Sequence, residues 1–157
     1  MINKKGILIK ALVLTLVGGL AFWLANFAIS RTAIAAEYRA AMSISYYPML
    51  LESLIGGLII GLWVSFLLLR FYSQTPGKDP IIKSVLLSFL VLVIVTISIA
   101  NPSTFKQTPD VSRYFIIGTV FNVIRITALG IAIGYVYKRQ HREVKSSMVA
   151  ASPAGLR

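Results

Sequence analysis

The residues best suited to chemistry in this chain lie inside a long apolar run. Arg125 sits near the middle of the mostly apolar stretch 116–137, and Asn122 lies about one helical turn before it. A guanidinium stays protonated and is costly within hydrocarbon, so it requires a carboxylate, carbonyl oxygens or water inside the protein. Arg125 therefore predicts either an ion pair that supports the fold or a site that receives an anion.

Glu52 is the candidate counter-charge, because it is the only carboxylate within the apolar runs. If both runs cross in the same direction, Glu52 lies about 6 Å below Pro48 and Arg125 about 16 Å below Tyr114, at 1.5 Å per residue. The arginine stem and the Asn122 amide could bridge the remaining distance. We therefore predict an intramembrane cluster of Glu52, Asn122 and Arg125. The alternatives are that Glu52 points to water near a helix start and that Arg125 is a structural strut.

Composition defines the elements that must position these groups. Of 157 residues, 57% are hydrophobic and 13% charged, about half the charge of a typical soluble domain. Four apolar runs, at 7–29, 48–69, 81–100 and 114–137, match the length of about 20 residues that crosses a bilayer as a helix. We predict an all-α, polytopic integral membrane protein in which residues 1–137 form a four-transmembrane-helix bundle. The basic segment 138–157 has no hydrophobic periodicity and is predicted to be a disordered tail.

The first apolar run and the segment that follows it each allow two interpretations. Residues 31–47 are alanine-rich and mildly amphipathic, which predicts a short interfacial helix between the first two spans, the alternative being a plain linker. The first run follows lysines and precedes the pattern Ala33-Ile34-Ala35, as a cleaved signal peptide would. It is longer than the apolar part of an ordinary signal, so we expect a retained anchor.

Small residues predict where helices approach closely. Four recur at every fourth position of the second run: Ser53, Gly57, Gly61 and Ser65. They line one stripe and predict packing within the bundle or, alternatively, a dimer seam. In the fourth run, Gly118 shares a face with Asn122 and Arg125. The pair Gly130 and Gly134 predicts a second place where another helix packs closely. The third run has few polar residues and is expected to face lipid more than the others.

The distribution of Lys and Arg predicts an orientation. With the N-terminus in the cytoplasm, eleven fall on the inner side and four on the outer side, and Arg125 completes the sixteen. This bias predicts both termini in the cytoplasm, and we expect the plasma membrane as the location. A basic cluster follows the last run: Lys138, Arg139, Arg142 and Lys145. It is predicted to set topology or, in addition, to bind anionic lipid headgroups.

Composition also narrows the function classes. The chain has no cysteine, and its one histidine, His141, lies in the basic segment. We expect no metal, no cofactor and no enzyme, because no nucleophile has an evident base. No nucleic-acid partner is expected, since the basic residues lie at the ends of apolar runs.

Two functional hypotheses follow. The first is an accessory, assembly or scaffolding subunit that acts in the bilayer through helix contacts, as a homo-oligomer or with a partner membrane protein. The alternative is an oligomeric transporter or channel subunit with Arg125 and Glu52 in the substrate or ion path.

Overall fold

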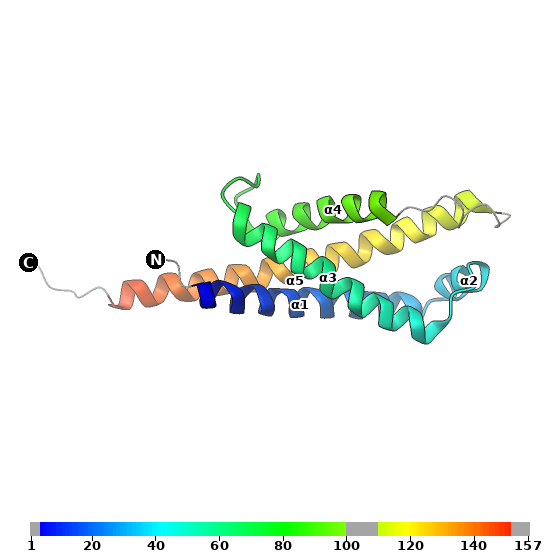
Figure 1. Ribbon diagram of the computed structural model, residues 1–157, viewed down its shortest axis with the longest axis horizontal. Coiled ribbons are helices and arrows are strands. Elements are labelled where there is room, and N and C mark those ends of the chain that lie inside the picture. Colours follow the sequence, from blue (N-terminus) through cyan, green and yellow to red (C-terminus); the bar gives the residue numbers. More distant parts are fainter. Residues whose placement is uncertain (1–3, 100–109, 152–157) are drawn as a thin grey trace, which may run out of the picture.

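The chain folds as helices. The computed structural model describes residues 4–99 and 110–151, and this part of the chain contains no strand (Figure 1). Its helices are α1 (Lys4–Ser30), α2 (Ala33–Ala41), α3 (Tyr46–Phe71), α4 (Pro80–Ile99) and α5 (Val111–Ala151). Four stretches are long and apolar enough to cross a membrane: Gly6–Ser30, Tyr46–Phe71, Pro80–Ile97 and Val111–Arg142. The predicted all-α fold with four membrane-type helices is confirmed.

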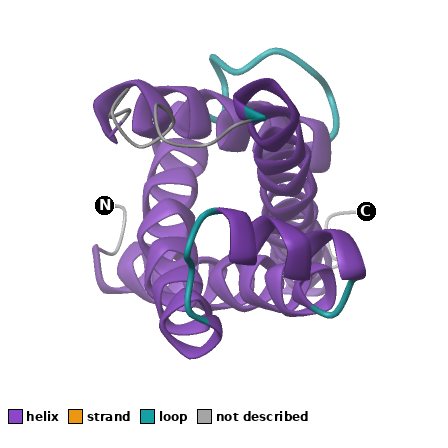
Figure 2. Ribbon diagram, turned by 90° about the vertical axis from the view of Figure 1, so that its right-hand side faces the viewer, coloured by secondary structure: helices purple, strands orange, loops and turns teal. Residues whose placement is uncertain are grey.

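The four long helices form an antiparallel bundle. They pack in the ring order α1, α3, α4, α5, with α5 returning to α1 and only limited contact across the ring. Figure 2 views this bundle along its long axis. One end, the Tyr38 end, holds α2 and the starts of α3 and α5. The opposite end, the Asp79 end, holds the turn between α3 and α4. Because every neighbour in the ring runs in the opposite direction, short connections suffice.

The helix boundaries differ from the sequence prediction in two places. α3 begins at Tyr46, so Pro48 lies inside the first turn, where its missing amide hydrogen still costs no helical bond. The disordered tail predicted from residue 138 is wrong over 138–151, because α5 continues to Ala151. The Lys, Arg, Gln, Glu and Ala residues there favour helix, and extending an existing helix needs no new nucleus. Ala100 and residues 152–157 lie outside the described residues.

The small-residue stripe of the second span packs within the chain. Ser53, Gly57, Gly61 and Ser65 are all buried. A Cβ atom at Gly57 would lie 3.1 Å from the Gly19 carbonyl oxygen, and one at Gly61 would lie 3.1 Å from the Thr15 carbonyl oxygen. Both glycines therefore face the α1 backbone directly. Of the two sequence interpretations, intramolecular packing is the one the structure shows.

Two glycines of α5 bring α4 equally close. A Cβ atom at Gly130 would lie 2.8 Å from Val85 Cα, and one at Gly134 would lie 2.5 Å from Ile81 Cα. The prediction that the third span faces lipid more than the others is wrong. Its window buries 28% of its residues, as do those of α1 and α3, against 22% for α5. Its polar residues Ser84 and Ser88 are fully buried, and Ser88 Oγ would lie 3.0 Å from a Cβ atom at Gly130 of α5.

The centre of the bundle is a continuous apolar core. Its fully buried side chains come from the long helices: Leu14, Val64, Leu68, Ile126, Leu129 and Ile133. Lipid tails are as apolar as these side chains, so the core stabilises the bundle through van der Waals packing rather than through removal from water. It also closes the bundle between the Asp79 end and the level of Arg125.

Candidate functional site: a cationic cavity beneath helix α2

Helix α2 is defined at both ends by local hydrogen bonds. At its start the Thr32 Oγ1 accepts a hydrogen bond from the Ala35 amide at 3.2 Å, as an N-cap residue does. At its end Ser43 takes a φ of 52°, and the next amide, of Ile44, donates to the Arg39 carbonyl at 2.8 Å. This left-handed closure usually uses glycine. It ends α2 and turns the chain toward α3, whereas the turn at Arg31 and Thr32 leads from α1 into α2 at the Tyr38 end of the bundle.

Side chains of α2 hold it against α5. Glu37 Oε1 lies 2.7 Å from Arg113 Nη2 and accepts a second hydrogen bond, at 3.4 Å, from the Tyr114 hydroxyl. The Tyr38 ring packs edge-on against Phe121, with ring centroids 5.8 Å apart. A Cβ atom at Gly118 would lie 2.9 Å from the Tyr38 hydroxyl oxygen, so this glycine makes room for the tyrosine. The interfacial helix is therefore attached to the last span rather than free.

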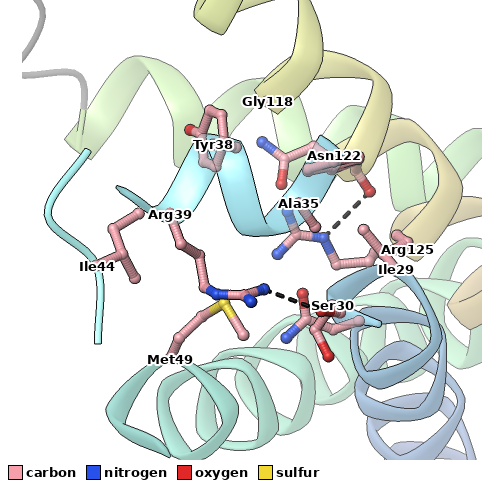
Figure 3. A pocket seen from close by; sticks show the side chains of 12 residues that line it. Ile29, Ser30, Ala35, Tyr38, Arg39, Ile44, Met49, Gly118, Asn122 and Arg125 are labelled. Carbon is pink, nitrogen blue, oxygen red and sulfur yellow. Dashed lines mark hydrogen bonds between the residues drawn. The ribbon is translucent and has the colours of Figure 1, made fainter. Parts of the chain in front are cut away.

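A cavity of about 230 Å³ lies between α2 and the ends of α1 and α5 (Figure 3). Its apolar wall includes the side chains of Ile29, Ile44, Met49 and Phe121. Its polar lining residues are Asn26, Ser30, Tyr38, Arg39, Asn122 and Arg125. None of the described lining residues carries a carboxylate. The volume suits a small solute or a headgroup rather than a drug-sized ligand.

The two arginines of the cavity are anchored through carbonyl oxygens. Arg125 Nε donates to the Phe121 carbonyl at 3.1 Å, and its guanidinium lies 5.7 Å from the centre of the Phe22 ring. Arg39 Nη1 donates to the Ser30 carbonyl at 3.0 Å. Carbonyl oxygens orient a guanidinium but leave its charge uncompensated. Figure 3 shows both side chains extending into the space between the helices.

Asn26 adds an unused donor to the same cavity. The residue is only 3% exposed, and its Nδ2 has no hydrogen-bond partner among the described residues. A buried amide without a partner costs about 1–3 kcal/mol, and natural structures seldom keep one without a reason. Sequence reading missed this residue, although an asparagine within an apolar run was a usable signal.

The predicted intramembrane cluster forms only in part. Gly118, Asn122 and Arg125 line one cavity, as their shared face predicted. Glu52 is exposed on α3, is not among the described lining residues and has no ion pair with Arg125 in the described parts of the chain. Glu52 does not face the cavity because it immediately precedes the buried residue Ser53, and successive residues of an α-helix point about 100° apart around the helix axis.

The predicted headgroup residues lie at the Asp79 end. Lys138, Arg139 and Arg142 line a shallow cavity beside the start of α4, whereas the side chain of Lys145 lies outside the described residues. Lys138 Nζ donates to Asp79 Oδ2 at 2.8 Å. This hydrogen bond, with one from the Ile81 amide, lowers the pKa of Asp79. Among the described residues no group of three His, Cys, Asp or Glu side chains could hold a metal ion.

Comparison with known proteins gives no further guide to the site. No family model matches the chain, and neither a curated protein nor a solved structure is significantly similar to it. The residues of the cavity are therefore interpreted from their own geometry.

Proposed function

We propose that this protein binds a small anion in the cavity beneath α2, as a subunit of a membrane transporter or channel. The observation that carries the proposal is that Arg39 and Arg125 share a cavity whose described lining residues include no carboxylate. Two like charges in a partly enclosed space repel each other, and an anion between them removes that repulsion. The unused Asn26 amide and the Asn122 side chain add neutral donors for its oxygen atoms.

The charge distribution supports an orientation for this binding. With both termini in the cytoplasm of a plasma membrane, the Tyr38 end faces outward and the cavity receives its ligand from outside. Passage to the other side would follow α5 past Leu129 and Ile133, which are fully buried. On this proposal, transport requires α1 and α5 to separate.

Ligand-induced stabilisation tests the binding step. Protein in neutral detergent is heated with acetate, succinate, inorganic phosphate or methanesulfonate. An anion at 100 times its Kd adds about 2.7 kcal/mol of stability, and each kcal/mol raises the Tm by about 2–4 °C for a chain of this size. Arg125→Gln and Arg39→Gln should each abolish the shift. The matched control is Arg31→Gln, which removes an exposed charge at the same end outside the cavity.

Asn26→Leu separates binding from folding. The substitution conserves volume and removes the amide without a partner, so the free protein should be at least as stable as wild type. It should nevertheless lose most of the anion-induced shift in Tm. An Asn26→Leu variant that keeps the full shift, or an anion that stabilises Arg125→Gln equally, would overturn the proposal. Uptake of the same anion into proteoliposomes then tests transport.

The accessory or assembly role remains a second hypothesis with a narrower basis. That role would use the small-residue stripe and the interfacial helix α2 to hold partners, and α1 covers the stripe. A homo-oligomer or partner membrane protein would have to use the lipid-facing sides of the bundle instead.

A further inference from the structure

A second cavity lies at the opposite end of α5. It has a volume of about 250 Å³ and is lined by Ile81, Tyr135, Lys138, Arg139 and Arg142. The four α5 residues recur at intervals of three and four, so they form one stripe where the helix leaves its apolar run. Ile81, in the first turn of α4, supplies the facing wall.

The cavity exists because α4 begins against α5. Gly134 allows the close approach, since a Cβ atom there would lie 2.5 Å from Ile81 Cα. Asp79 then fixes both elements, accepting a hydrogen bond from the Ile81 amide at 3.1 Å and one from Lys138 Nζ at 2.8 Å. The described residues that line the cavity include three cations, Lys138, Arg139 and Arg142, and no carboxylate, so its rim is basic.

The apolar part of this cavity lies on the side of the apolar run of α5. Tyr135 is 60% exposed and lies one turn before the cations, toward the middle of that run. A tyrosine at this depth suits the boundary between hydrocarbon and headgroups. A soluble phosphate would use only the cationic rim, whereas a lipid would use both the rim and the apolar wall.

We infer that this cavity holds the phosphate of an anionic phospholipid, with Arg139 and Arg142 at the phosphate and with Tyr135 and Ile81 along the first acyl carbons. Basic pockets between spans on the cytoplasmic side are suited to such headgroups, and guanidinium groups donate pairs of hydrogen bonds to phosphate. The two cavities lie toward opposite ends of the bundle and share no described lining residue, so this site does not depend on the proposed anion cavity.

Mass spectrometry under non-denaturing conditions tests this site. Purified full-length protein is exchanged into detergent with equal amounts of dioleoyl phosphatidylglycerol and dioleoyl phosphatidylcholine. We expect the phosphatidylglycerol to be retained selectively as one tightly held molecule. Arg139→Gln and Arg142→Gln should each weaken its retention about fivefold, since a basic residue near a membrane surface contributes about 1 kcal/mol.

Three controls make the result decisive. Arg70→Gln removes an equal charge from an exposed position at the end of α3 and should leave retention unchanged. Arg125→Gln should also leave it unchanged, so failure of one site is distinguishable from failure of the other. Circular dichroism and Tm confirm that each variant folds. Equal retention of phosphatidylcholine, an Arg70→Gln loss as large as that of Arg142→Gln, or full displacement by soluble glycerol phosphate would overturn the inference.

Discussion

At the scale of single residues, the charged side chains differ in whether they form an ion pair. Glu37 meets Arg113 at 2.7 Å and Asp79 meets Lys138 at 2.8 Å, both at the ends of the bundle. Arg125, deeper in the bundle, donates to a carbonyl and lies near an aromatic ring, and it has no ion pair with a described carboxylate. A buried cation without a counter-charge in the protein is suited to bind an anionic ligand, because the ligand then supplies the counter-charge.

The first prediction concerns Glu52 and Arg125. Because Glu52 is exposed and does not line the Arg125 cavity, Glu52→Gln should not strand the cation. Its effect on the free energy of unfolding should add to that of Arg125→Gln within about 0.5 kcal/mol. Thermal or denaturant unfolding of wild type, both single variants and the double variant measures this coupling. A coupling energy above about 1 kcal/mol would show that the two side chains meet after all.

Asp79 carries the second prediction, a pH dependence. Its pKa in the folded protein is lowered by the Lys138 and Ile81 hydrogen bonds, below an unfolded value of about 3.9. The carboxylate therefore stabilises the fold above about pH 4, and this contribution is lost as the pH falls through the lower folded pKa.

Comparison with Asp79→Asn isolates this contribution. The Tm difference between wild type and Asp79→Asn should be constant from pH 7 to about pH 5 and should shrink below about pH 4. Salt should reduce it, because the pair is partly exposed. A difference that grows as the pH falls would contradict the assignment.

At the scale of elements, α2 decides whether the cavity exists. It has nine residues and would be unstable alone, since isolated helices below about 12 residues are marginal in water. The Thr32 cap, the Ser43 closure and the Glu37 ion pair together fix it over the bundle end.

The third prediction tests how α2 ends. Ser43 has a φ of 52°, a conformation that glycine adopts without steric cost. Ser43→Gly should stabilise the protein by about 1 kcal/mol and raise the Tm by about 2–4 °C. Ser45→Gly is the matched control, because Ser45 has a φ of −72° and glycine there only adds unfolded-state entropy. Equal effects of the two substitutions would contradict the closure.

The fourth prediction concerns the contact between α1 and α3. Gly57→Leu and Gly61→Leu should each destabilise the bundle by about 1–3 kcal/mol or more, since the added side chains meet the α1 backbone. Val93→Leu, at a position that is 52% exposed on α4, should have little effect. Unfolding in detergent compares the three variants, and similar stabilities would mean that the two spans do not pack as described.

At the scale of the whole molecule, the bundle has two chemically different ends. The Tyr38 end carries the cavity with two arginines, and the Asp79 end carries the basic stripe along α5. The apolar core separates them. The excess of Lys and Arg toward the Asp79 end predicts that this end lies in the cytoplasm.

The fifth prediction is the resulting topology. Reporter fusions after Arg157 and before Met1 should report the cytoplasm, as should one inserted at Gly77 in the turn between α3 and α4. Fusions within 31–45 and 100–110 should report the outer side. A fusion before Met1 that reports the outer side, or a 31–45 fusion that reports the cytoplasm, would contradict the predicted orientation. Fusions at Gly77 and within 100–110 that report the same side would contradict the third span.

The sequence by itself determined the elements, whereas the tertiary structure decided which polar residues meet. Length and hydropathy sufficed for the spans, because any apolar helix of about 20 residues satisfies its backbone within itself. The spacing of Gly118, Asn122 and Arg125 on one helix was likewise local, and these three share the cavity. Glu52 shows what the sequence could not predict. Its depth along the helix follows from counting residues, but the neighbour that its side chain faces depends on how the helices pack. Asn26 of α1 and Arg39 of α2 line the same cavity as Arg125 of α5, and only the packed bundle brings these three elements together.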